Sequence, residues 1–341
     1  MKILFVTNTI GAAARGGLFI QATKTAEYLK ANNIEVTLHN AWEHIHLTQF
    51  DAVHIFGAGI GTYHFAREIH KRNIPFILSP VHFSSHSVKK IRMALNVQSS
   101  FRKIISGTWT DIGIVEEMCK WATGIVPNTS DEAKLLTEGL KIPKEKIHIV
   151  PNGVEERFAT ATPDEWKEKF GTENFVLNVG YWGKRKNTLP LIRALKKLSL
   201  PAVLIGGYAN DEYGKLCIQE LADAKNIHTL DSLEHDSSLL ASCYAAAKVF
   251  VLPSLFETPG ISALEAGLAG ANIAITKFGG TEEYFLAHAS YLDPHSEESI
   301  AETILSTFQK EKTTALREHI LQNFMWESVA KKTEEAYKHF L

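Results

Sequence analysis

Short apolar runs alternate with amphipathic stretches along nearly the whole chain. In the first half the apolar runs are rich in β-branched and aromatic residues, which is typical of buried strands. Strands are expected at 2–7, 35–40, 51–57 and 75–80, and helices at 17–32 and 62–72. This alternation predicts βαβ units around a parallel sheet that is covered on both faces.

A second series of the same kind begins near Phe175. Strands are expected at 175–180, 202–207, 227–232, 248–254 and 272–276, and helices at 189–198, 239–246 and 261–268. The Pro-Asn-Gly turn in VPNGVEERF, residues 150–158, lies between the two series and marks their junction. The last residues, WESVAKKTEEAYKHF, predict an amphipathic helix because their apolar positions recur at helical spacing, at Trp326, Val329, Ala330 and Tyr337.

Length and composition agree with a globular protein of two α/β domains. The chain has 341 residues, of which 45% are hydrophobic and 22% charged. A formal net charge of -2 gives no general attraction to nucleic acid, so no nucleic-acid partner is expected. Cys119, Cys217 and Cys243 are few and widely spaced, which favours a reducing compartment over a disulfide framework.

The apolar run at the start of the chain is interpreted as a buried strand and not as a signal peptide. Polar residues at 7–9 interrupt it, and a helical pattern follows. No apolar run approaches the ~18 residues that span a bilayer. The expected location is therefore cytoplasmic.

Ligand sites are expected in the loops that follow the strands. In open α/β sheets ligands bind outside the carboxyl ends of the strands, and two facing domains would enclose a cleft between these loops. Gly11, Gly16 and Gly17 follow the first strand and form either a phosphate-binding loop or a plain strand-to-helix turn. The pattern is not GxGxxG, which argues against a nicotinamide cofactor.

Two histidines lie at strand ends, His54 and His82. His82 and His86 have the spacing of a helical metal pair, but Pro80 and the neighbouring serines indicate a loop and no third ligand is evident, so a zinc site is not favoured. His82 is either a site residue or a loop histidine whose hydrogen bonds are satisfied.

Three cations, Lys184, Arg185 and Lys186, follow the strand at 175–180. A run of this kind is commonly a solvated surface patch. At the end of a strand, however, fixed positive charge would stabilise a departing diphosphate. We favour the second interpretation because of the position of the run.

Two carboxylates flank the stretch SLFETPGISALEAG at 254–267. Glu257 and Glu265 are either a solvated loop residue and an exposed helix residue, or members of a site. In the second case the strand delivers Glu257 to the sheet edge, and the N-terminus of the helix at 261–268 faces the same space as Lys186. Carboxylates accept hydrogen bonds from sugar hydroxyls, so the arrangement indicates a nucleotide-sugar site.

The segment LPSLFETPGISALEAGLAGANIAITKFGGTEEYF resembles the signature of the retaining glycosyltransferases of family 4. With VGYWGKRKN, VPNTSDEAKLL and VPNGV, the resemblance covers nearly the whole chain. It implies the GT-B fold, which is two facing Rossmann-like domains with an interdomain cleft. An acceptor-binding domain is expected at 1–157 and a donor-binding domain at 158–326, with the C-terminal helix, 327–341, packing back on the first.

The resemblance also implies roles for individual residues. Lys186 would bind the donor diphosphate, Glu265 the nucleotide ribose and Glu257 the donor sugar, and His82 would lie near the transferred sugar. The implied catalytic residues are His82, Lys186 and Glu257. The implied donor-binding residues are Gly16, Gly17, Arg185, Lys186, Glu257, Thr258, Gly260, Ile261 and Glu265.

One position departs from the family pattern. Tyr181 stands where members usually carry an arginine, so half of the usual cation pair is missing. Lys184 and Arg185 are adjacent cations that could replace it.

The activity implied is transfer of a sugar from a nucleotide-sugar, expected to be a UDP-sugar, to a saccharide or lipid-linked acceptor in polysaccharide or glycoconjugate biosynthesis. The anomeric configuration would be retained, and neither a metal nor a cofactor is expected. Two alternatives remain open at this point: a sugar-nucleotide epimerase of the same fold and a non-catalytic nucleotide-sugar-binding partner.

The segment 88–105 combines apolar residues with five cations. It is either a solvated surface helix or an interfacial helix that contacts anionic lipid on the inner face of a membrane. The cations are Lys89, Lys90, Arg92, Arg102 and Lys103.

Overall fold

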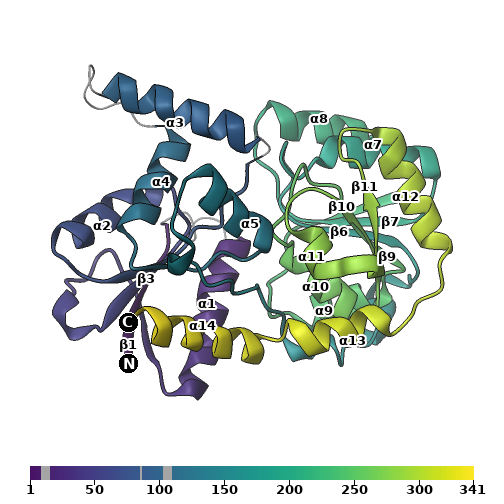
Figure 1. The fold of residues 1–341 in the computed structure, drawn as a ribbon. Coiled ribbons are helices and arrows are strands. Elements are labelled where there is room, and N and C mark those ends of the chain that lie inside the picture. Colours follow the sequence, from purple (N-terminus) through teal and green to yellow (C-terminus); the bar gives the residue numbers. More distant parts are fainter. Residues whose placement is uncertain (9–15, 85–86, 103–109) are drawn as a thin grey trace. The chain divides into compact units, whose positions relative to one another are not determined.

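The computed structural model describes residues 1–8, 16–84, 87–102 and 110–341 (Figure 1). The chain divides into two compact units, one of Met1–Gly153 with Trp326–Leu341 and the other of Val154–Met325. Each unit is built on its own parallel sheet, which confirms the predicted α/β class.

The sheet of the first unit has the order β2-β1-β3-β4-β5, and all its neighbouring strands are parallel. Its interior strands are buried on both faces, because helices cover the sheet on each side. The strands are β1 (Lys2–Val6), β2 (Glu35–Leu38), β3 (Ala52–Phe56), β4 (Phe76–Ser79) and β5 (Gly124–Ile125).

The helices of this unit follow the strands in the alternating pattern. They are α1 (Gly17–Leu29), α2 (Ile60–Lys71), α3 (Val88–Arg102), α4 (Asp111–Trp121), α5 (Ser130–Lys134) and the last helix of the chain, α14 (Trp326–Phe340). Short helical turns lie at η2 (Lys30–Asn32), η3 (Leu47–Gln49), η4 (Leu135–Gly139) and η5 (Lys144–Lys146).

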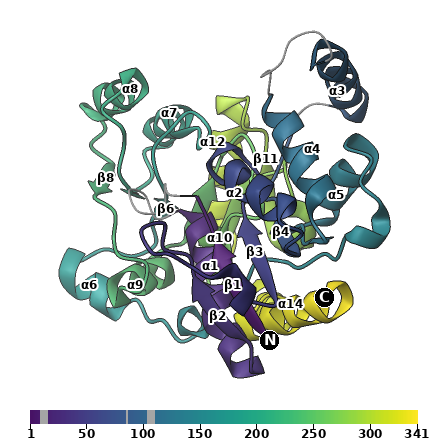
Figure 2. The same cartoon turned by 90° about the vertical axis from the view of Figure 1, so that its left-hand side faces the viewer.

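Helix α14 packs against α1 and the sheet of the first unit (Figure 2). Its buried positions, among them Trp326, Val329 and Tyr337, recur every three or four residues, as the sequence pattern predicts. The Tyr337 hydroxyl lies 2.6 Å from Nδ1 of His54, whose Nε2 lies 2.9 Å from Oγ of Ser79. Complete burial lowers the pKa of His54 to about 3, so this histidine is a neutral structural link between helix and sheet.

The sheet of the second unit has the order β11-β10-β9-β6-β7-β8 and is also parallel. The central strands carry continuous apolar runs that are buried on both faces. The strands are β6 (Val176–Val179), β7 (Ala202–Ile205), β8 (Ile227–Leu230), β9 (Val249–Leu252), β10 (Asn272–Thr276) and β11 (Ala289–Leu292).

Helices of the second unit cover both faces of this sheet (Figure 1). They are α6 (Asp164–Phe170), α7 (Thr188–Leu198), α8 (Glu212–Leu221), α9 (Ser238–Ala246), α10 (Ile261–Leu268), α11 (Thr281–Phe285), α12 (Glu297–Gln309) and α13 (Ala315–Asn323). Short turns lie at η6 (Glu156–Phe158) and η7 (Leu286–His288).

Candidate functional site

The order of strands reverses between β6 and β9 in the second unit. The chain builds β6, β7 and β8 in one direction and then returns to the other side of β6 with β9, β10 and β11. β6 and β9 are therefore paired neighbours although they are far apart in the sequence. Ligands of doubly wound sheets bind outside the carboxyl ends of the strands at such a reversal, so the loops after β6 and β9 form the candidate site.

These two loops bring opposite charges together. Nζ of Lys186 lies 2.6 Å from Oε1 of Glu257, and Nη1 of Arg185 lies 3.4 Å from the same oxygen. The backbone carbonyl of Arg185 accepts a hydrogen bond of 2.8 Å from the Leu255 amide, which ties the two loops together. The run of cations is therefore not a uniformly solvated patch. Lys184 differs from Arg185 and Lys186, because it makes no ion pair with any residue that the structure describes.

Glu257 is a buried anion with only 5% of its surface exposed, so its interpretation as a solvated loop residue is wrong. Burial by itself would raise its pKa, but the charges of Lys186 and Arg185 outweigh burial and hold the pKa of Glu257 below the ordinary value of 4.5. An ammonium group has three N–H donors. Because the Lys186 side chain is still 22% exposed, it has donors left for a second anion.

A Gly-Gly turn fixes the backbone of Glu257. The Glu257 amide donates to the carbonyl of Phe278 at 3.1 Å, and its carbonyl accepts from the amide of Gly280 at 3.0 Å. Gly279 between them has φ of 95°, and a Cβ at this position would lie 1.9 Å from the Glu257 carbonyl oxygen. Only glycine fits there, so the Gly-Gly pair of the sequence motif has a steric cause.

The chain turns through Thr258 and Pro259 into helix α10. Gly260 is the N-cap residue, has φ of 91° and offers no side chain to cap the helix. The first N–H groups of α10, including that of Ile261, have no acceptor within the helix and carry the positive end of its dipole. The start of α10 thus adds positive potential at the end of β9.

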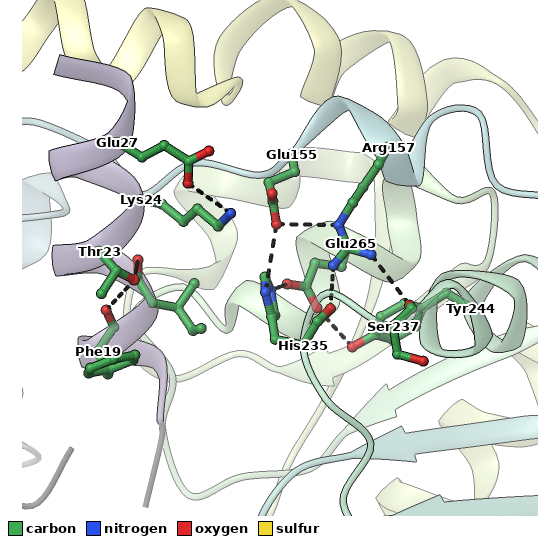
Figure 3. A network of polar contacts seen from close by, with 11 residues as sticks. Phe19, Thr23, Lys24, Glu27, Glu155, Arg157, His235, Ser237, Tyr244 and Glu265 are labelled. Carbon is green, nitrogen blue, oxygen red and sulfur yellow. Dashed lines mark hydrogen bonds and ion pairs between the residues drawn. The ribbon is translucent and has the colours of Figure 1, made fainter. Parts of the chain in front are cut away.

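Glu265 lies on α10 and is 4% exposed, so it is not the exposed helix residue of the first interpretation. Its Oε2 accepts a hydrogen bond of 2.9 Å from the hydroxyl of Tyr244, and its Oε1 lies 2.8 Å from Nε2 of His235 (Figure 3). A carboxylate oxygen has two acceptor positions, so each oxygen keeps one. Glu265 can therefore accept from two neighbouring hydroxyls at once.

In the first unit, His82 lies in the loop after β4. Its Nε2 is buried and has no hydrogen-bond partner among the residues that the structure describes. Burial lowers the pKa of His82, although nearby Asp111 opposes the shift. The ring is therefore neutral, and within the described part of the chain its Nε2 is unpaired.

A buried carboxylate, Glu132, holds the loop of His82 in place. Its Oε1 accepts from the His82 amide at 2.7 Å and its Oε2 from the Asn128 amide at 2.8 Å. Oδ1 of Asn128 accepts in turn from Gln21 of α1 at 2.9 Å. Burial raises the pKa of Glu132 to about 7, although the backbone N–H groups act against this shift. One carboxyl group thus joins the loops after β4 and β5.

Gly16 and Gly17 begin helix α1 and are exposed. The backbone at Gly16 has φ of -104°, and a Cβ there would meet no atom of the described residues within 4 Å, so neither its conformation nor its packing against those residues requires glycine. Gly11 and His86 lie outside the described residues.

The structure thus brings Arg185, Lys186 and Glu257 together, while Glu265 has separate partners on the same sheet edge. Sequence reasoning missed the residues that hold the carboxylates and the His82 loop: Tyr244, His235 and Glu132. Glu132 has a signal, because the spacing from Thr129 is that of a capping box, and Thr129 Oγ1 accepts from the Glu132 amide at 3.0 Å. His235 has only its place after a predicted strand.

Helix α3 exposes both cations and apolar side chains. Lys89, Lys90 and Arg92 are exposed, as are Met93 and Val97, while Ile91 is buried in the core of the first unit. Lys103 and the rest of the predicted segment to 105 lie outside the described residues, as does the side chain of Arg102.

Neither a membrane-spanning helix nor a metal-binding cluster occurs among the residues that the structure describes. No helix in these parts of the chain is long and apolar enough to cross a membrane. Within the same residues, no group of three or more His, Cys, Asp or Glu side chains is placed to hold a metal ion.

The two units each contain a parallel Rossmann-like sheet, as glycosyltransferases of the GT-B type do. Two family models match the chain and together account for most of it. Glycosyltransferase Family 4 matches residues 24–158, and Glycosyl transferases group 1 matches residues 162–323. The chain belongs to these glycosyltransferase families.

Curated relatives match the chain over part of their length. An uncharacterized glycosyltransferase of Methanocaldococcus jannaschii is 27% identical over 217 residues, which cover 58% of this chain and 55% of the relative. Mannosylfructose-phosphate synthase of Agrobacterium fabrum is 26% identical over 206 residues, 55% of this chain and 45% of the relative. The chain spans about half the length of these relatives.

Solved structures match over nearly the whole chain. Sucrose-phosphate synthase from Thermosynechococcus elongatus has a TM-score of 0.77 at 16% identity, covering 99% of this chain and 98% of that one. WaaG, a glycosyltransferase involved in lipopolysaccharide biosynthesis, has a TM-score of 0.65 at 16% identity, covering 98% of each chain. At these identities the likeness shows the fold alone.

Proposed function

We propose that the protein transfers a sugar from a nucleotide-sugar, in the first place a UDP-sugar, to a saccharide or lipid-linked acceptor with retention of the anomeric configuration and without a metal. The observation that carries the proposal is the contact of Lys186 and Arg185 with Glu257 at the carboxyl ends of β6 and β9. It supplies a fixed cation with spare donors beside a carboxylate, and these are the groups that a diphosphate and a sugar need.

Each half of the donor has its own partners in this proposal. Lys186 and the N-terminus of α10, at Gly260 and Ile261, bind the diphosphate and stabilise the negative charge that grows as it departs. Glu257 accepts from hydroxyls of the donor sugar, and Glu265 accepts from the ribose hydroxyls.

Arg185 takes the place of the arginine that is missing at position 181. Its guanidinium reaches Glu257 and also donates to the Phe256 carbonyl at 3.2 Å. The second cation of the pair thus comes from a position four residues along the same loop. The exposed Tyr181 then has no charge to supply.

Transfer needs one bond to form and one to break on the same face of the sugar. The acceptor hydroxyl oxygen attacks the anomeric carbon from the side on which the diphosphate leaves. The bond between the anomeric carbon and the diphosphate oxygen breaks, and the acceptor proton passes to an oxygen of the leaving diphosphate. No protein group is needed as a base, so the protein contributes electrostatic stabilisation, and His82 orients the transferred sugar through its unpaired Nε2.

A lipid-linked acceptor in polysaccharide or glycoconjugate synthesis would suit helix α3. Its exposed cations, Met93 and Val97 support contact with an anionic membrane surface, from a cytoplasmic protein at the inner face. Flotation with vesicles of phosphatidylglycerol and phosphatidylcholine at low salt tests this contact. Failure to float with the acidic vesicles overturns it and leaves a saccharide acceptor.

The proposed activity is tested in two stages. A thermal-shift screen against UDP-, GDP- and ADP-sugars identifies the donor, because a ligand of the folded state raises Tm. NMR of the donor with a panel of saccharide acceptors, with and without EDTA, then reports transfer and the anomeric configuration of the product. Inversion, or dependence on a metal, would refute the corresponding part of the proposal, and binding without transfer to any acceptor would refute the activity.

A further inference from the structure

The loop between β8 and α9 places His235 between two carboxylates (Figure 3). Its Nε2 lies 2.8 Å from Oε1 of Glu265, and its Nδ1 lies 3.6 Å from Oε2 of Glu155, within ion-pair distance but beyond hydrogen-bond length. A neutral imidazole has one N–H and one bare lone pair. A bare lone pair that faces a carboxylate is repelled, so this position favours an imidazolium with both nitrogens protonated.

Arg157 fixes the position of this loop independently of Glu265. Its guanidinium donates to the backbone carbonyls of His235 and Ser237, and its Nε lies 3.4 Å from Oε2 of Glu155. The guanidinium also lies over the ring of Phe158, 4.0 Å from the centroid. The loop therefore presents His235 to Glu265 from a position that other contacts hold.

His235 is surrounded by two carboxylates and one other cation. The carboxylates of Glu155 and Glu265 face Arg157 and His235, and all four side chains are buried or half-buried. Burial and Arg157 lower the pKa of His235, but the hydrogen bond and charge of Glu265 and the charge of Glu155 outweigh them and raise the pKa above 6.5. Tyr244 of α9 touches Glu265 and stays a donor, because burial raises its own pKa far above the usual range.

We infer that His235 is a positioning residue for the donor nucleotide, which as an imidazolium orients Glu265 toward the ribose hydroxyls. This inference rests on the proposed role of Glu265 in binding ribose. His235 and Tyr244 each occupy one acceptor position on a different oxygen of Glu265, and the remaining position on each oxygen is left for one of two neighbouring hydroxyls. Loss of the imidazolium removes one positive charge beside Glu265, which disfavours an anionic nucleotide.

Two substitutions separate the hydrogen bond from the charge. His235→Gln keeps an N–H donor for Glu265 but carries no charge, and His235→Ala removes both. His228→Gln is the matched control, because this histidine is exposed on the neighbouring strand β8. It should behave as wild type throughout.

The readout is the preference for ribose, measured as the ratio of Kd values of 2′-deoxy and ribonucleoside diphosphates by calorimetry on the full chain. UDP, GDP and ADP and their 2′-deoxy counterparts are the probes. We expect wild type to prefer the ribonucleotide about tenfold or more at about pH 6, and less at about pH 9, since a hydrogen bond to a charged group has about this value. His235→Gln should lower the preference and remove its pH dependence, and His235→Ala should abolish the preference.

An unchanged preference and an unchanged pH dependence in the folded variants would overturn the role of His235. The proposed function stands in that case if the nucleotides still bind and Lys186→Ala weakens binding. If wild type binds none of the three nucleotides, both the proposed function and this inference fail. If circular dichroism shows that His235→Ala does not fold, His235→Gln decides, because its donor preserves the contact with Glu265.

Discussion

Substitution of Lys186 by alanine is the strongest test of the site, because it removes the nearest cation from a buried carboxylate. At the observed 2.6 Å, two unit charges attract by about 6 kcal/mol at an effective dielectric constant of about 20. The net loss is smaller, since Arg185 stays 3.4 Å from the same oxygen of Glu257 and the Lys186 side chain is 22% exposed. Removal of one partner from a fully buried pair costs about 3–5 kcal/mol. We therefore expect the free energy of unfolding to fall by about 2 kcal/mol.

The same substitution should also lower kcat strongly, in protein that is still folded. Loss of one preorganised group that stabilises transition-state charge lowers kcat by about 100- to 1000-fold, equivalent to about 2.7–4 kcal/mol. Lys184→Ala is the control, because Lys184 is exposed and two residues away on the same loop. Its free energy of unfolding should change by less than about 0.5 kcal/mol and its kcat by less than about twofold.

Urea unfolding at several pH values and steady-state kinetics with the identified donor measure these effects. Because the pKa of Glu257 is lowered in the folded state, its ion pair stabilises the protein above pH 4.5 and this contribution is lost as the pH falls through the folded pKa. The stability difference between wild type and Lys186→Ala should therefore narrow in acid. Equal losses of kcat in the Lys184 and Lys186 variants, or a stability difference that does not depend on pH, would refute the reasoning.

Three further predictions concern residues that hold the loops and helix α14 in place. Gly279→Ala should lower the free energy of unfolding, measured with urea, by about 2–3 kcal/mol, because its Cβ would lie 1.9 Å from a carbonyl oxygen. Gly270→Ala is the control: it also has positive φ, but its Cβ would have no atom of the described residues within 4 Å, so it should lower the free energy by about 1 kcal/mol. Equal losses in the two variants would contradict the clash. Because the pKa of Glu132 is raised from 4.5 to about 7, the free energy of unfolding of wild type should fall by up to about 3 kcal/mol as pH rises from 4.5 to 7. Urea unfolding of Glu132→Gln should not show this pH dependence. The same pH dependence in both proteins would mean that another group causes it. Tyr337→Phe leaves a nitrogen of the buried histidine in β3 unpaired and should lower the free energy of unfolding by about 1–3 kcal/mol in thermal melts, and an unchanged Tm would argue against that hydrogen bond.

The fold could be predicted because parallel strands that are buried on both faces leave continuous apolar runs in the sequence. Two strands were not predicted. β5 is only Gly124–Ile125, too short to give a pattern, and β11, Ala289–Leu292, lies at a sheet edge and is partly exposed. Both are positioned by pairing with a neighbouring strand, which the local sequence does not encode.

The candidate site could be predicted in part for a related reason. Lys186 and Glu257 each follow a strong strand signal, and strand ends are where ligands bind. The partners of Glu265 come from two separate segments, with His235 after β8 and Tyr244 on α9. Glu155, which faces His235, comes from a third segment, before η6. These residues come together because of the order of the strands in the sheet and the direction of the side chains. The spacing of residues in the sequence reveals neither.

The two buried glutamates differ in the kind of cation that each one faces, and this difference has a kinetic consequence. Glu257 faces Lys186 and Arg185, which hold its pKa below 4.5, whereas Glu265 faces His235, whose pKa is raised from 6.5 by the neighbouring carboxylates. In the proposed site, the contact of Glu257 to the donor sugar should therefore not change between about pH 6 and pH 9, while the contact to ribose weakens. KM for the donor should rise with pH as kcat stays level, because the lost interaction is made equally in the ground state and the transition state. A kcat that falls in parallel with the donor affinity would instead mean that the group that titrates acts on the reacting centre.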